Sequence, residues 1–164
     1  MNREPGSAHV VEIKPVRADS DDAISLIQAL EDDLRARYPG IISHGLRPDD
    51  PMHQRFVFMV AYADGQAIGC AAIRELPHDV GEVKRMFVRP RWRGRGVARK
   101  ILTSLEDHAL ERGFVALRLE TGSGQPEAIG LYRSAGYREI PAFADYVGNA
   151  VSVCFEKKLS RLSL

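Results

Sequence analysis

The sequence predicts a mixed α/β fold (an α+β arrangement on one mixed sheet), in which antiparallel strands lead into a parallel strand–helix–strand unit. Two apolar runs flanking the turn at residues 63–66 have the pattern of an antiparallel hairpin. Further on, an amphipathic helix separates two strand-like runs, and this order makes the two strands parallel. The length of 164 residues suits one domain. We therefore expect residues 1–164 to form a single domain, with flexible ends at 1–8 and 160–164.

Hydrophobic patterning predicts seven strands and three helices. Strands are expected where short apolar runs are bounded by Gly, Pro or Asp, at residues 9–16, 56–62, 66–75, 82–88, 114–121, 137–140 and 150–158. Helices are expected where apolar residues recur three or four positions apart, at residues 20–37, 96–113 and 126–135. In the strand at 114–121, the alternating apolar residues are expected to point inward, and they are Val115, Leu117 and Leu119.

The first helix has recognisable ends and one apolar face. Asp19 or Ser20 can cap its first turn, and Pro39 and Gly40 end it. Residues 38–53 mix Pro, Gly and Asp without clear periodicity, which predicts a loop. The residues expected to face the core are Ala23, Ile24, Ile27, Leu30 and Leu34.

A cationic segment joins the predicted strand at 82–88 to the predicted helix at 96–113. Eight of the 23 Lys and Arg residues lie between Lys84 and Lys100, with no acidic residue among them, although the net charge is only +1. The start of a helix presents free backbone N–H groups and favours negative charge, and Gly94 and Gly96 let a ligand approach the backbone. The segment therefore predicts a phosphate site; surface arginines without a ligand are the alternative. Three side chains can add charge-assisted hydrogen bonds, namely Arg91, Arg93 and Arg95.

Several classes of protein are disfavoured by pattern. The G-x-G-x-x-G dinucleotide fingerprint fails because Arg99 stands where a small residue must pack, and the chain contains no G-x-x-x-x-G-K-[ST] motif. No apolar run approaches the ~20 residues of a membrane span, and the first residues lack a secretory signal, so we expect a cytoplasmic protein. Cys70 and Cys154 have no neighbours at metal-ligand spacing, which predicts reduced core thiols and no metal.

Two motifs resemble the GNAT superfamily of acyl-coenzyme A dependent N-acetyltransferases. The family signature Q/R-x-x-G-x-G/A is matched by Arg93, Gly96 and Ala98. Downstream, AIGLYRSAGYR is similar to the family's A-x-x-L-Y-x-x-x-G-F-x segment, with Tyr137 in place of the usual Phe. The resemblance implies a three-layer fold with helices on both faces of the sheet and central strands that splay apart.

The resemblance also implies acetyl-coenzyme A as the acyl donor. Its pantetheine arm is expected along the strand at 82–88, with Phe87 and Val88 nearest the thioester. Gln125 stands where many relatives carry an Asn directed at the cofactor. The diphosphate is expected on the backbone amides of one turn, formed by Arg93, Gly94, Arg95, Gly96, Val97 and Ala98.

The catalytic roles implied by the resemblance fall on two residues. Tyr132 occupies the position that donates a proton to the departing thiolate, and a phenol is protonated at neutral pH. Glu82 aligns approximately with a base found in some relatives; an exposed strand-end carboxylate paired with Lys84 or Arg85 is the alternative. Tyr146 is expected to line the acceptor pocket.

The acceptor itself is expected to be a primary amine, carried by a small molecule or a peptide. The first helix, residues 38–53 and residues 141–148 are expected to build its pocket. A non-catalytic module that binds acyl-coenzyme A is the alternative function. Nucleic-acid binding through the arginines is disfavoured because the cationic patch is compact and interrupted by glycines. Pairing of the last strand with a second chain leaves a homodimer open.

Overall fold

The protein, described here by a computed structural model for residues 8–40 and 57–161, forms one seven-stranded sheet with the order β1-β2-β3-β4-β5-β7-β6. The strands are β1 (Glu12–Val16), β2 (Val57–Ala63), β3 (Gln66–Leu76), β4 (Val80–Val88), β5 (Ala116–Gly122), β6 (Arg138–Ile140) and β7 (Ser152–Lys158). The α-helices are α1 (Asp21–Arg37), α2 (Val97–Glu111) and α3 (Pro126–Ser134), and two short 3-10 turns are η2 (Pro90–Trp92) and η3 (Ala144–Tyr146). Residue 56 of the second predicted strand and residues 41–53 of the predicted loop lie outside the described residues.

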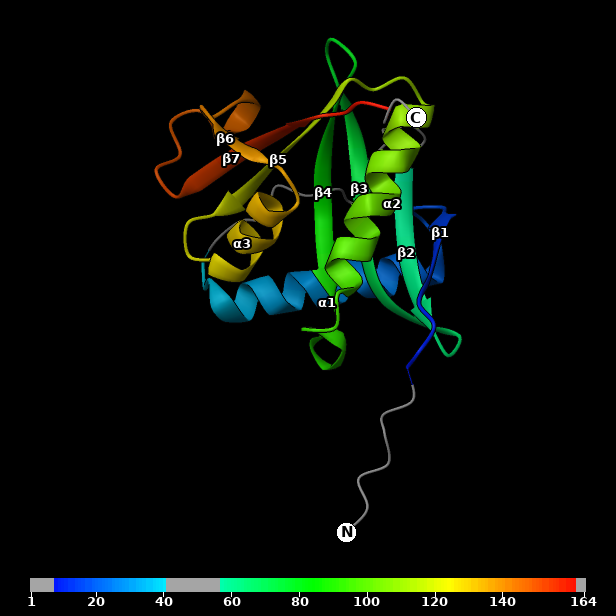
Figure 1. The fold of residues 1–164 in the computed structure, drawn as a ribbon. Helices are drawn as coiled ribbons and strands as arrows, with labels where there is room; N and C mark the ends of the chain where they lie inside the picture. The colour runs from blue at the N-terminus through cyan, green and yellow to red at the C-terminus, as the bar shows by residue number, and fades with distance from the viewer. Residues whose placement is uncertain (1–7, 41–56, 162–164) are drawn as a thin grey trace.

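Helices cover both faces of the sheet, which confirms the three-layer expectation (Figure 1). Alternate residues of β2 point to opposite layers: Phe58 and Val60 pack with α1, whereas Met59 and Ala61 pack with α2. A strand buried on both faces therefore reads as a continuous apolar run, as β2 does. The layer formed with α2 and α3 is the larger of the two apolar clusters.

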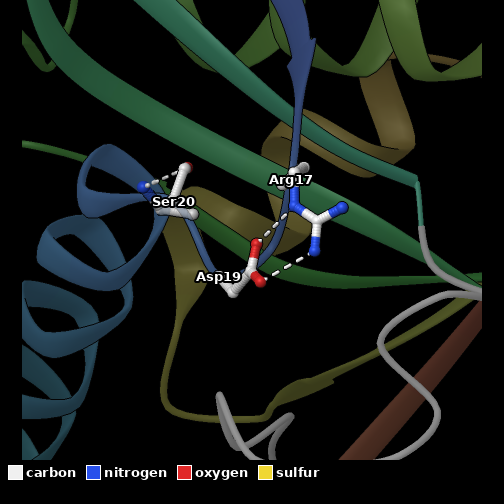
Figure 2. Close-up of polar contacts among 4 residues, drawn as sticks. Arg17, Asp19 and Ser20 are labelled. Carbon is white, nitrogen blue, oxygen red and sulfur yellow. Dashed lines mark hydrogen bonds and ion pairs between the residues drawn. The ribbon is translucent and has the colours of Figure 1, made fainter.

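The start of α1 is fixed by two local polar contacts (Figure 2). Ser20 is the N-cap, and its Oγ accepts from the Ala23 N–H at 3.3 Å. Just before it, the Arg17 guanidinium donates to both carboxylate oxygens of Asp19, each at 2.9 Å. The predicted apolar face of α1 is wrong at one position, because Ile24 is 40% exposed and Leu26 is buried instead.

The predicted hairpin of β2 and β3 is confirmed. Ala63 pairs with Gln66, which leaves Asp64 and Gly65 as a two-residue turn. Both turn residues have positive φ, 51° and 74°, as a type I′ turn requires. The D-G pair therefore specifies the turn, whereas the register of the strands shifts by one residue at a β-bulge between Ala61 and Tyr62.

The predicted parallel unit is also present, because β4 and β5 pair in parallel through the α2 crossover. β4 begins at Val80, two residues earlier than predicted, so Glu82 lies inside the strand and not at its end. β5 begins at Ala116, so the inward position predicted for Val115 is wrong: this side chain is 54% exposed. Its backbone N–H instead bonds the Asp79 carbonyl at 2.8 Å.

The last strand, β7, lies between β5 and β6 and pairs antiparallel with both. β7 is therefore not an edge strand, and the dimer pairing through this strand that the sequence left open has no free edge there; the edge strands of the described sheet are β1 and β6. No helix in the described part of the chain has the length and apolar character that crossing a membrane requires.

Candidate active site

The turn before α2 leaves its backbone open to a ligand. Gly94 and Gly96 have φ of 72° and 77°, a left-handed conformation that glycine adopts at little cost. A Cβ built on either glycine meets no atom within 4 Å, so the space beside both is open. Gly96 is the N-cap of α2, and the helix has no acidic residue in its first turn. The N–H groups of this turn lie beyond the reach of intrahelical acceptors, and they form a surface suited to an anion.

The Arg93 side chain, in contrast, is engaged by the protein. Its Nε donates to the Val88 carbonyl at 2.8 Å, and Nη2 lies 3.4 Å from Asp33 Oδ2 in α1. The guanidinium also lies 5.6 Å from the centre of the Phe87 ring. Arg93 therefore joins the turn to β4 and α1. Its backbone N–H bonds the Pro90 carbonyl at 3.2 Å, so the backbone donors that the turn offers to a ligand begin at Gly94.

Trp92 explains where the neighbouring arginines lie. Its indole is only 6% exposed and contacts the His9 ring edge-on, with ring centres 5.0 Å apart. The guanidinium carbons of Arg91 and Arg95 lie 5.9 and 5.5 Å from the indole centre. Trp92 thus packs against the protein, and two arginines are held beside the turn by cation–π contacts.

β4 and β5 stop pairing halfway along their length. Their parallel register runs from Val80 opposite Ala116 to Val83 opposite Leu119, although both strands continue. On the other side of β4, the register with β3 shifts by one residue next to Arg85, whose φ is 59°. This β-bulge bends the strand away from β5, and Figure 1 shows the two strands diverging. We call this opening the β4–β5 split.

Polar side chains gather at the β4–β5 split. Glu82 is 2% exposed, and its carboxylate accepts from the Tyr146 hydroxyl at 3.2 Å. Lys84 Nζ lies 3.3 Å from the other oxygen of Glu82 and donates to the Tyr146 oxygen at 3.1 Å. The structure thus brings Glu82 and Tyr146 together. The alternative is wrong in placing Glu82 at an exposed strand end, but the pairing with Lys84 that it included is present.

A second carboxylate, which the sequence reasoning missed, lies beside this pair. Glu120 is the first residue of β5 past the last pair with β4, and its Oε1 accepts from Ser152 Oγ at 2.9 Å. Burial raises the pKa of Glu120, the Ser152 hydrogen bond and the Lys84 charge lower it, and the Glu82 charge raises it again. An acidic residue inside a predicted strand was the available signal. We refer to Glu82, Lys84, Glu120, Tyr146 and Ser152 as the carboxylate cluster.

Tyr132 lies in α3 and is 5% exposed. Its ring contacts Tyr137 edge-on and Phe155 at a tilt, with ring centres 5.9 and 6.4 Å apart. Burial raises the pKa of Tyr132, and the Glu120 charge raises it further, so the phenol stays protonated at neutral pH. Within the described chain, nothing hydrogen-bonds its hydroxyl, which is therefore available to a ligand.

The remaining residues singled out in the sequence are Gln125 and the two cysteines. Gln125 occupies the N-cap position of α3, but its side chain does not cap the helix; its backbone N–H bonds the Gly122 carbonyl at 3.0 Å. Cys70 and Cys154 are both buried free thiols. Across residues 8–40 and 57–161, no group of three or more His, Cys, Asp or Glu side chains could hold a metal ion.

Comparison with known proteins gives one family. The sequence profile of the Acetyltransferase (GNAT) family matches residues 25–137. The chain is 37% identical over 140 residues to an IAA acetyltransferase of Azospirillum brasilense, covering 85% of this chain and 92% of the relative. It is 34% identical over 118 residues to the uncharacterized N-acetyltransferase YsnE of Bacillus subtilis, covering 71% and 78%.

Solved structures agree in fold. A structure described as an acyl-CoA N-acyltransferase of Klebsiella pneumoniae superposes with a TM-score of 0.77 at 34% identity, over 92% of this chain and 98% of that one. The PaiA N-acetyltransferase of Thermoplasma acidophilum, solved in complex with coenzyme A, has a TM-score of 0.73 at 17% identity, over 91% and 99%.

Proposed function

Because this chain belongs to the Acetyltransferase (GNAT) family, we propose that it transfers an acetyl group from acetyl-coenzyme A to a primary amine, by direct attack of the amine on the thioester in a ternary complex. The observation that carries the proposal is the course of β4. This strand ends at the open turn before α2, and on the way it separates from β5 beside a cluster of proton-transfer groups. An anionic donor held at the turn thus has a path along β4 to those groups.

The turn and the open edge of β4 would hold acetyl-coenzyme A. The backbone amides of the turn that have no partner among the described residues suit its diphosphate, and they belong to Gly94, Arg95, Gly96, Val97 and Ala98. Beyond Val83, β4 forms no pair with β5, so its edge near Phe87 and Val88 can bond the amide groups of the pantetheine arm as an added strand would. Gln125, whose backbone N–H bonds the Gly122 carbonyl at the end of β5, is proposed to contact the cofactor from that side.

When bound, acetyl-coenzyme A supplies an activated acyl group, and the protein must supply proton transfers. Only a neutral amine attacks a carbonyl carbon. For a lysine-like amine of pKa ~10.4, loss of the proton at pH 7 costs roughly 4.6 kcal/mol. Glu82 is the base that the sequence predicts, and the carboxylate cluster contains Glu120 as a second carboxylate.

Tyr132 is the proposed acid. As the carbon–sulfur bond breaks, the Tyr132 hydroxyl gives its proton to the sulfur, and the raised pKa keeps that proton in place until the thiolate forms. Burial also raises the pKa of Cys154, so this thiol is a poor nucleophile and the direct route needs no acyl-cysteine. Tyr146, bonded to Glu82 and Lys84, is proposed to line the acceptor pocket.

The proposal is tested by incubating the protein with acetyl-coenzyme A and a panel of small and peptide amines while thiol release is followed. Turnover that depends on the amine supports transfer, and mass spectrometry of the product identifies the acceptor. Coenzyme A uptake without turnover for any amine supports the alternative of a non-catalytic binding module. Absence of coenzyme A uptake in calorimetry refutes both.

A further inference from the structure

We propose that Glu120 is the carboxylate that takes the proton from the acceptor ammonium, and that Glu82 instead positions Tyr146 and Lys84. This inference rests on the proposed acetyl transfer and assigns the base within it. It differs from the prediction made from the sequence, in which Glu82 was the leading candidate for the base. The contacts of the two carboxylates decide between them.

Both oxygens of Glu82 already have partners. One lies 3.3 Å from Lys84 Nζ, and the other accepts from the Tyr146 hydroxyl at 3.2 Å. The side chain of Lys84 is itself 12% exposed, so the ion pair is shielded from solvent. With Lys84 on one oxygen and the Tyr146 hydroxyl on the other, neither oxygen of Glu82 is left open to an incoming ammonium. Its geometry suits a residue that holds others in place.

Glu120 has one oxygen fixed and one available. Ser152 Oγ donates to Oε1 at 2.9 Å and thereby orients the carboxylate. Oε2 has no hydrogen bond or ion pair with any described residue, so an incoming ammonium can use it. The residue lies at the apex of the β4–β5 split, because the register would place it opposite Lys84 if pairing continued past Val83. A group at that apex can reach an amine that attacks a thioester lying along β4.

The surroundings of Glu120 favour a stronger base than an ordinary carboxylate. Burial and the Glu82 charge raise its pKa, while the Ser152 hydrogen bond and Lys84 lower it, and the net direction is upward. A carboxylate with a raised pKa accepts a proton more readily near neutral pH. The titratable groups that face it from the described elements are Glu82 and Lys84 of β4, Tyr132 of α3, Tyr146 of η3 and Cys154 of β7.

The proton balance closes with this assignment. An N–H bond of the ammonium breaks, and its proton goes to Glu120. The nitrogen lone pair then forms the carbon–nitrogen bond, the electron pair of the carbon–sulfur bond stays on sulfur, and Tyr132 protonates the sulfur. The second proton lost by the nitrogen restores Tyr132 through water, and Glu120 releases its proton to solvent. One proton is released per amide formed.

The test compares Glu120→Gln with Glu82→Gln in the intact chain. With an acceptor amine of high pKa, Glu120→Gln is expected to lower kcat at pH 7 by about 10²–10⁴-fold and to leave the Kd for coenzyme A unchanged. Its activity should recover about tenfold per pH unit as the amine deprotonates itself. Glu82→Gln is expected to raise KM for the amine more than it lowers kcat. It should keep the acidic limb of the pH profile, which is the fall in kcat as the base becomes protonated.

Thermal unfolding without any substrate gives an independent readout. The folded state raises the pKa of Glu120, so it binds a proton more tightly than the unfolded state, and the resulting stability is lost as pH rises through the folded pKa. Glu120→Gln should therefore raise Tm relative to wild type above that pH, and the gain should vanish in acid. Glu82→Gln should lower Tm because Lys84 loses its buried partner.

Each outcome is decisive. If Glu120→Gln retains wild-type kcat and the acidic limb, or if Glu82→Gln alone removes that limb, Glu120 is not the base although acetyl transfer stands. If wild type binds coenzyme A but acetylates no amine, the proposed function fails and the assignment fails with it. A Tm of Glu120→Gln below wild type at every pH would assign the residue a structural role and overturn the inference.

Discussion

Tyr132 and Tyr137 form a matched pair in which one hydroxyl is predicted to serve chemistry and the other stability. Their rings are in edge-on contact, both are buried, and burial is the main cause that raises the pKa of each phenol. The difference lies in the hydroxyl. Tyr137 donates to Glu106 at 3.2 Å, whereas the Tyr132 hydroxyl has no hydrogen-bond partner among the described residues. Replacing each Tyr by Phe keeps the ring and removes only the hydroxyl.

The expected magnitudes separate the two variants. Tyr137→Phe removes a hydrogen bond to a carboxylate, worth about 1.5–3 kcal/mol, which at about 2–4 °C per kcal/mol lowers Tm by roughly 3–12 °C for a chain of this size. Glu106 keeps its ion pair with Lys157 at 2.9 Å, so no charge is left buried alone. Tyr132→Phe breaks no internal hydrogen bond and should leave Tm within about 1 °C, while kcat falls by about 10²–10⁴-fold.

Two measurements on each variant check this prediction: thermal unfolding by circular dichroism, and thiol release with a competent amine under saturating acetyl-coenzyme A. Calorimetric titration with coenzyme A controls for binding, which both variants should retain. The reasoning is refuted if Tyr132→Phe turns over as fast as wild type, or if its Tm falls as far as that of Tyr137→Phe. A loss of kcat in Tyr137→Phe would show that the Glu106 contact supports the site.

Three further predictions use other contacts. Gly96→Ala and Gly113→Ala should each cost about 1–2 kcal/mol of stability, because both glycines have positive φ and open space beside them. Only Gly96→Ala should weaken coenzyme A binding in calorimetry. Equal Kd values for the two variants would contradict an anion site at the turn. Ser20→Ala should lower stability by about 1 kcal/mol through loss of the N-cap, with unchanged turnover. Iodoacetamide at pH 8 should label Cys70 and Cys154 slowly until urea is added. Burial raises the pKa of both thiols, that of Cys70 to about 12. Rapid labelling of the native protein, measured by mass spectrometry, would disprove this.

Local signals in the sequence predicted most of the fold. The D-G turn specified a hairpin, and the strand–helix–strand order specified a parallel pair, since both rules act over short stretches of chain. The errors occur where tertiary context decides. Ile24 lies on the predicted apolar face of α1, but the sheet covers a face centred on Leu26 and Leu30. Val115 continues the alternation of β5, but pairing begins only at Ala116.

The candidate site was predictable only in part. Residues in the two family motifs, such as Gly96 and Tyr132, could be named because each motif is contiguous in the sequence. Glu120 could not, because its proximity to Glu82 follows from the parallel register, and no local signal sets that register. Ser152 is more remote still, since it reaches Glu120 through the pairing of β5 with β7.

The β-bulge at Arg85 connects the fold to the proposed chemistry. A non-glycine residue at φ 59° costs on the order of 1–3 kcal/mol, and the local contacts offset this: Arg85 Nη2 lies 3.5 Å from Glu31 of α1, and its carbonyl accepts from Cys70 Sγ at 3.3 Å. A regular β4 would continue its pairing with β5 past Val83 and bring Lys84 opposite Glu120. The main-chain groups proposed to bind the donor would then be consumed by the sheet, and the oxygen of Glu120 proposed to accept a proton would face a lysine in place of a substrate. The bulge therefore keeps both free, which is a reason for a strained residue to persist at the centre of the sheet.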